Sequence, residues 1–185
     1  MLKFAPHLKE NVERRRQDLA ASPSRTGVMS VRTWMLGDQR SRGDLNGHQA
    51  ESDEDTTYGG SDAAPRPLAY LLAALGFCEQ TMISRWASDR ELQLEDVQIE
   101  TKGYWDRKGG HVEGFEPTGF GRFTVRVEVQ SPEDADTIRE MMENVERQCY
   151  VVNTFKRCAR VEHTLIHNGD EIMATVVGES PSDAP

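Results

Sequence analysis

Two cysteines are the residues of this chain that most suggest chemistry. Cys78 lies in the apolar segment 67–78, which begins with a proline and has the composition of a helix buried on every side. Cys149 follows an amphipathic segment, at a point where a further helix begins. Because thiolates are both nucleophiles and redox groups, two thiols that the fold brings together predict thiol redox chemistry.

A cysteine in an apolar helix also has a structural interpretation, as a small core residue. We expect the third cysteine, Cys158, to be such a residue, with a third redox thiol as the alternative. The histidines do not show the spacing of zinc ligands. The glycine pairs do not sit between a strand and a helix as phosphate-binding loops do. We therefore predict neither a metal site nor a bound cofactor.

Composition narrows the class of protein further. The chain has 185 residues and a net charge of −9, and its one basic cluster, Arg14–Arg16, is flanked by acids, which argues against a nucleic-acid partner. No apolar run is long enough to span a membrane, and the first residues lack the apolar region of a signal peptide. We expect a cytoplasmic protein, in which cysteines are more often free than paired as structural disulfides.

The local patterns predict helices and strands in a mixed order. Val97, Ile99 and Thr101 alternate with polar residues, as do the apolar residues of 120–130, so both segments suit strands with one buried face. Ser131 has the position of a helix N-cap. The predicted helices are 6–21, 67–90, one after Ser131 and a short one from Cys149; the predicted strands are 26–36, a weak one near 45–51, 96–102, 120–130 and a hairpin of 161–167 with 171–177, and a long polar loop covers 37–66.

This order predicts an α+β fold, in which an antiparallel sheet wraps around the central apolar helix 67–90. One small sheet covers only one side of that helix, so we infer a homodimer with the helix at its centre. We divide the chain into an N-terminal helical arm at 1–25, one domain at 26–177 and a disordered tail at 178–185.

Two motifs resemble those of the OsmC/Ohr family, the osmotically inducible protein C and organic hydroperoxide resistance proteins. The first contains an acidic stretch, Gly59-Gly60, Pro67 and the Leu/Ala-rich helix that carries Cys78. The second begins at Cys149, where the family usually reads Cys-Pro and this chain has Tyr150. The resemblance covers roughly residues 26–177.

The resemblance implies an intertwined homodimer with two active sites at the subunit interface. It also implies a thiol peroxidase, in which Cys78 attacks the O–O bond of a small organic hydroperoxide and Cys149 resolves the sulfenic acid as a disulfide. A dithiol reductant, with lipoyl-type dithiols as one candidate, would restore the thiols.

Such a mechanism requires an ionised Cys78, and a free cysteine with a pKa of ~8.5 is mostly thiol at neutral pH. Cys78 lies some three turns into its helix, beyond the reach of the N-terminal dipole. A cation must therefore stabilise the thiolate, and in the family an arginine from the N-terminal strands does so. Arg32, Arg40 and Arg42 are the candidates, and Arg40 is the first choice because it follows the turn at Gly37.

In the hydroperoxide-resistance branch a glutamate after the proline orients that arginine. Leu68 stands there in this chain and cannot do so, so we expect Asp53 or Glu54 to take that role.

The leucine also leaves a second hypothesis open, that of a non-catalytic dimeric stress protein that binds a small hydrophobic ligand at the dimer interface. The paired cysteines favour the enzyme, and Leu68 favours the binding protein.

Overall fold

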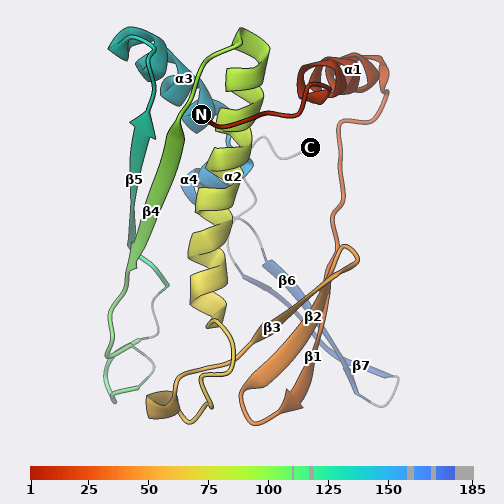
Figure 1. The fold of residues 1–185 in the computed structure, drawn as a ribbon. Helices are drawn as coiled ribbons and strands as arrows, with labels where there is room; N and C mark the ends of the chain where they lie inside the picture. Colours follow the sequence, from red (N-terminus) through yellow and green to blue (C-terminus); the bar gives the residue numbers. More distant parts are fainter. Residues whose placement is uncertain (110, 117–118, 158–160, 168–169, 178–185) are drawn as a thin grey trace.

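The computed structural model describes residues 1–109, 111–116, 119–157, 161–167 and 170–177. Cys158 and the tail predicted at 178–185 lie outside these residues. The described part of the chain is an α+β fold with four α-helices and antiparallel sheets (Figure 1). Its elements are α1 (Leu8–Ala21), β1 (Arg32–Gly37), β2 (Arg40–Leu45), β3 (His48–Ser52), the 3-10 helix η1 (Thr56–Tyr58), α2 (Pro67–Arg90), β4 (Asp96–Tyr104), β5 (Arg122–Gln130), α3 (Ala135–Gln148), α4 (Tyr150–Arg157), β6 (Val161–His167) and β7 (Asp170–Val177).

The long helix α2 has the bounds that its sequence predicts. Pro67 occupies the first turn, where its missing N–H costs nothing, and Glu91 ends the helix in the left-handed conformation. Its buried face repeats every four residues through Leu75, Glu79, Ile83 and Ala87. The last two of these residues form the core with Leu94, Met141 and Val145.

A two-stranded sheet of β4 and β5 packs against α2. Its register places apolar residues opposite one another, with Val97 facing Val129 and Ile99 facing Val127, as the alternating pattern predicts. Thr101 donates a hydrogen bond of 3.0 Å to the Leu72 carbonyl oxygen and so ties β4 to α2. Among the described residues, the strands form three separate antiparallel sheets, β1–β2–β3, β4–β5 and β6–β7, so no single one of these sheets surrounds α2.

Helix α3 begins later than its sequence suggested. Asp134 is the N-cap, and its carboxylate accepts hydrogen bonds from the backbone N–H groups of Asp136 and Thr137. The prediction of Ser131 as the cap was wrong because the helix begins only after Asp134; the Ser131 hydroxyl accepts from the Glu133 N–H at 3.1 Å and donates to the Gln93 carbonyl oxygen at 2.6 Å. That bond holds the start of α3 beside the end of α2, so the two helices run antiparallel.

Residues 37–66 are not the long loop that their polar composition predicted. Two of the three strands of the first sheet, β2 and β3, lie in this stretch, followed by η1. Every residue of β1 is exposed, and Met35 is 75% exposed. The Tyr70 hydroxyl, which donates to the Glu51 carbonyl oxygen at 2.6 Å, ties this sheet to the start of α2.

The N-terminal residues are anchored at the other end of α2. The Leu2 N–H donates to the Leu94 carbonyl oxygen at 2.7 Å, and Phe4 packs against the core. Lys9 of α1 forms an ion pair of 2.8 Å with Glu91. The division into arm and domain stays a prediction. No helix in the described ranges has the length and apolar character needed to cross a membrane.

Candidate functional site

The fold brings Cys78 and Cys149 together. Cys78 is half-buried on α2, and Cys149 is fully buried, with 0% of its surface exposed. Both are free thiols, and they are close enough that Cys78 affects the ionisation of Cys149. The partly exposed thiol is the one that an incoming molecule meets first, and the buried thiol lies behind it.

Cys149 joins two helices. Its N–H donates to Val145 to close α3, and its carbonyl oxygen accepts the first hydrogen bond of α4, from Asn153, at 3.0 Å. Burial raises the pKa of Cys149 to about 11, the hydrogen bond from the Val152 backbone N–H opposes the rise, and the neighbouring Cys78 thiol adds to it. Cys149 is therefore a thiol at neutral pH and must lose a proton before it can attack.

An aromatic stack holds α4 in place. The rings of Phe155 on α4 and Phe123 on β5 are parallel within 6°, with centroids 4.5 Å apart. Phe123 contacts Phe120 edge-on, and Phe120 contacts Trp105 in the same way. The helix that begins at Cys149 is thus fixed to the same sheet that supports α2.

Arg40 lies on the first sheet and shares one acid with Arg42. Arg42 faces Glu51 directly in the β2–β3 register, and Arg40 points to the same face of β2 two residues away. Both guanidinium groups donate to the Glu51 carboxylate, at 2.5 Å from Arg40 and 2.6 Å from Arg42. These bonds lower the pKa of Glu51, so the cluster keeps one surplus positive charge.

Within the chain, Glu51 pairs with Arg40, a role that we expected for Asp53 or Glu54. Asp53 turns inward instead, and its carboxylate accepts hydrogen bonds from the Ser61 hydroxyl at 2.7 Å and from the Ala63 N–H at 3.1 Å. Glu54 forms an ion pair with Arg66, at 3.6 Å. In one chain, hydrogen bonds and ion pairs join these two acids to other residues, and their role toward Arg40 stays a prediction.

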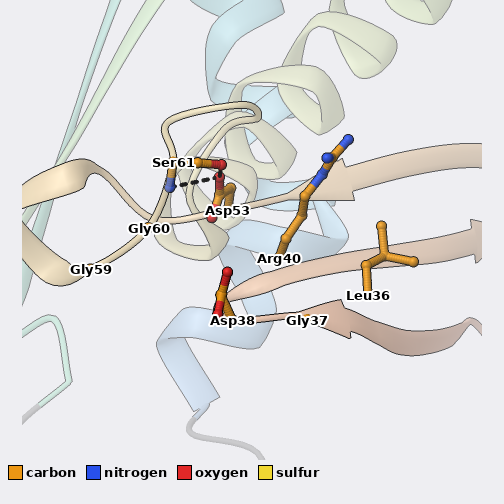
Figure 2. A pocket seen from close by; sticks show the side chains of 8 residues that line it. All are labelled: Leu36, Gly37, Asp38, Arg40, Asp53, Gly59, Gly60 and Ser61. Carbon is orange, nitrogen blue, oxygen red and sulfur yellow. Dashed lines mark hydrogen bonds between the residues drawn. The ribbon is translucent and has the colours of Figure 1, made fainter.

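Asp53 builds one wall of a polar pocket beside Arg40. The pocket has a volume of about 280 Å³, and Figure 2 shows the Asp53–Ser61 contact and the Arg40 side chain running away from it. The bond from the Ser61 hydroxyl and that from the Ala63 N–H lower the pKa of Asp53 to about 2. The pocket is lined by Leu36, Gly37, Asp38, Arg40, Asp53, Gly59, Gly60 and Ser61.

The other predicted site residues are spread along the chain. Arg32 begins β1 and faces Asp44 of β2. Leu68 is exposed in the first turn of α2. Among the residues that the structure describes, no three metal-binding side chains converge. No described interaction joins Arg40, Arg42 or Arg32 to Cys78 of the same chain.

Glu79 is a further residue near the thiols that the sequence did not single out. It directly follows Cys78, and its side chain lies on the buried face of α2, with 3% of the residue exposed. One carboxyl oxygen, Oε2, is buried without a hydrogen-bond partner in the described part of the chain. Burial raises the pKa of Glu79, and the charge of Glu146 raises it further.

The fold and the paired cysteines define a class that known proteins share. The model of the OsmC-like protein family matches residues 59–164, more than half of the chain. This chain therefore belongs to the OsmC-like protein family. A comparison with curated proteins gave no match.

Solved structures share the fold at low identity. An OsmC-like protein from Mycoplasma pneumoniae is 18% identical, with a TM-score of 0.60 over 71% of this chain and 89% of that one. A putative osmotic stress induced and detoxification response protein from Psychrobacter arcticus is 17% identical, with a TM-score of 0.58 over 70% and 89%. An OsmC-like hydroperoxide resistance protein from Jannaschia is 23% identical, with a TM-score of 0.51 over 75% and 91%.

Proposed function

We propose that this protein is a thiol-dependent peroxidase that reduces organic hydroperoxides. The observation that carries the proposal is the contact between a half-buried Cys78 and a fully buried Cys149. The Cys78 thiolate attacks one oxygen of the O–O bond, which breaks, and the alkoxide takes up a proton and leaves as an alcohol. Cys149 then attacks the Cys78 sulfenic acid, which gives a disulfide and water. A dithiol reductant restores both thiols and is itself oxidised to a disulfide.

The proposal includes a homodimer. Residues 28–36 expose six large apolar side chains, and Phe77 on α2 is 65% exposed. Full burial of one such side chain is worth about 1.5–3 kcal/mol. The side chains of two chains together therefore match or exceed an association cost of about 4–15 kcal/mol. A second copy that covers these residues explains why β1 has no buried face of its own.

The dimer also supplies the activating charge. A half-buried thiol requires a cation to ionise at neutral pH, and the Arg40–Glu51–Arg42 cluster carries a surplus positive charge on an exposed sheet. We propose that Arg40 of one chain approaches Cys78 of the other, with Glu51 holding the arginine in position. The substrate then binds where the two chains meet.

Counting thiols tests the proposed reaction. In a Cys158→Ser background the chain has two thiols, and one equivalent of cumene hydroperoxide should remove both, as measured with Ellman's reagent in denaturant. Cys78→Ser should lose none. Cys149→Ser should stop at a sulfenic acid that dimedone traps on Cys78. If two thiols remain after peroxide treatment of the unmutated pair, the peroxidase proposal is wrong.

A non-catalytic ligand-binding protein is the second candidate, and Leu68 supports it. The leucine is 47% exposed at the start of α2, and Leu71 one turn later is exposed too, which gives the helix an apolar face. In that case peroxide leaves the thiol count unchanged, and the apolar face binds a hydrophobic dye in a saturable way.

A further inference from the structure

We infer that Glu79 is the proton carrier of the thiol pair, an inference that rests on the proposed function. The step it serves is disulfide formation, in which Cys149 must lose a proton and the hydroxyl of the Cys78 sulfenic acid must gain one. Because Cys149 is buried, bulk water does not reach its proton freely.

The packing of α2 against α3 places Glu79 at the same height along the helix pair as Cys149. The start of α3 lies beside the end of α2, through the bond from Ser131 to Gln93, and the helices run antiparallel from there. Met141 and Val145 pack with Ile83 and Ala87 in the core.

One turn before Ile83 on α2, the next buried residue is Glu79. One turn after Val145 on α3, the next buried residue is Cys149, where the helix ends. Two further observations agree with this placement. Cys78, the residue before Glu79, lies close enough to Cys149 to affect the ionisation of Cys149, and Glu146 in the last turn of α3 lies close enough for its charge to raise the pKa of Glu79.

The burial of the Glu79 carboxyl group is consistent with a role in proton transfer. A buried carboxyl group with an unpartnered oxygen is costly, and a core position between Leu75 and Ile83 would be more stable with an apolar residue. Proteins retain such groups where the chemistry needs them. Burial, and then the charge of Glu146, raise the pKa of Glu79, so this carboxyl group holds a proton more readily than an exposed glutamate does.

The step balances without an added reagent. The Cys149 sulfur bonds to the Cys78 sulfur while the S–O bond of the sulfenic acid breaks. Glu79 accepts the proton of Cys149 and delivers a proton to the departing hydroxyl, which leaves as water. Glu79 ends the step in the protonation state in which it began.

The test separates the two chemical steps in a Cys158→Ser background. Glu79→Gln keeps the shape and hydrogen-bonding capacity of the side chain but cannot carry a proton. The rate of sulfenic acid formation, measured by dimedone trapping in the Cys149→Ser variant, should change less than twofold. The rate of disulfide formation, measured by rapid quenching with an alkylating reagent, should fall by about 10²-fold. Glu143→Gln, which removes an exposed acid from α3, is the matched control and should leave both steps nearly unchanged.

A second oxidant makes the outcome independent of peroxide. Diamide oxidises Cys78 as an adduct, and Cys149 must again lose a proton to close the disulfide. If closure with diamide slows in Glu79→Gln while peroxide leaves the wild-type thiols intact, Glu79 keeps its role and the peroxidase proposal fails. If closure is unchanged with both oxidants, the inference about Glu79 is overturned.

Stability separates this role from a structural one. Glu79→Leu removes the unpartnered carboxyl group and should raise Tm, while disulfide closure stays as slow as in Glu79→Gln. A fall in Tm for both variants, with both chemical steps slowed alike, would show a structural role and overturn the inference.

Discussion

The region around the thiols and the region around Arg40 differ in how much of their environment one chain provides. Cys149 is fully buried where α3 ends and α4 begins, and Val145, to which its N–H donates, is buried in the same chain. Arg40 lies on a sheet whose first strand is exposed at every residue. Under the proposed function, one chain holds both thiols of the disulfide, whereas the arginine that activates Cys78 comes from a second chain.

The largest expected effect comes from a charge on the exposed strand. Met35→Glu should convert the dimer to a monomer at micromolar concentration and abolish most peroxide turnover, because the substitution places a charge in the proposed interface. Within one chain the side chain is exposed, so Tm of the monomer should change little. Sedimentation and peroxide consumption are the measurements.

Leu19→Glu on α1 is the control for this substitution, since it puts the same charge on an exposed apolar position of the arm. If Met35→Glu remains dimeric and active, β1 is not the interface and the comparison between the two regions fails.

A smaller effect is expected from the arginine cluster. Arg40→Met should slow alkylation of Cys78 by iodoacetamide at pH 7 about tenfold, because an adjacent cation lowers a thiol pKa by about one unit or more. Glu51→Gln should also alter the rate, since Glu51 holds both Arg40 and Arg42. Unchanged alkylation in Arg40→Met, Arg42→Met and Arg32→Met would show that no arginine activates Cys78.

The smallest effect is expected in the pocket wall. Asp53→Asn should lower Tm by several degrees at neutral pH, because the carboxylate holds Ser61 and Ala63. The folded pKa of about 2 lies below the ordinary value of 3.8, so this stabilisation is present above pH 3.8 and is lost as the pH falls through 2. The Tm difference between wild type and variant should shrink over that range.

Asp38→Asn controls for the loss of charge in the same pocket. Asp38 has a positive φ of 47°, a conformation that asparagine also tolerates, so its Tm should stay close to that of the wild type. An equal loss of Tm in both variants would mean that pocket charge, rather than the hydrogen bonds of Asp53, carries the effect.

Much of the fold followed from apolar periodicity, and the departures fall where that periodicity is absent. Helix α2 and the pairing of Val97 with Val129 were predictable because each has a buried face. Strands β2 and β3 are mostly polar, so their pattern indicated only the weak strand near 45–51, which overlaps β3, and β2 was assigned to the loop.

The site was predictable only in part, for a similar reason. The two cysteines stood out by residue type. Glu51 was missed because its pairing with Arg40 and Arg42 depends on a strand register that the sequence does not reveal. Glu79 was missed because it follows the apolar segment directly and was interpreted as the start of its polar side, whereas the four-residue spacing from Leu75 to Ile83 contains the signal.

The segment between α1 and β1 sets a geometric limit on the molecule. Residues 22–31 are ten in number and span at most about 33–36 Å when extended. Helix α2, with 24 residues at 1.5 Å each, is about 36 Å long. Since α1 is attached near the end of α2 and the first sheet near its start, these ten residues join the two attachments (Figure 1). Their extended reach is the upper limit on the distance between the end of α1 and the start of β1, so the N-terminal helix limits how far the arginine strands can move.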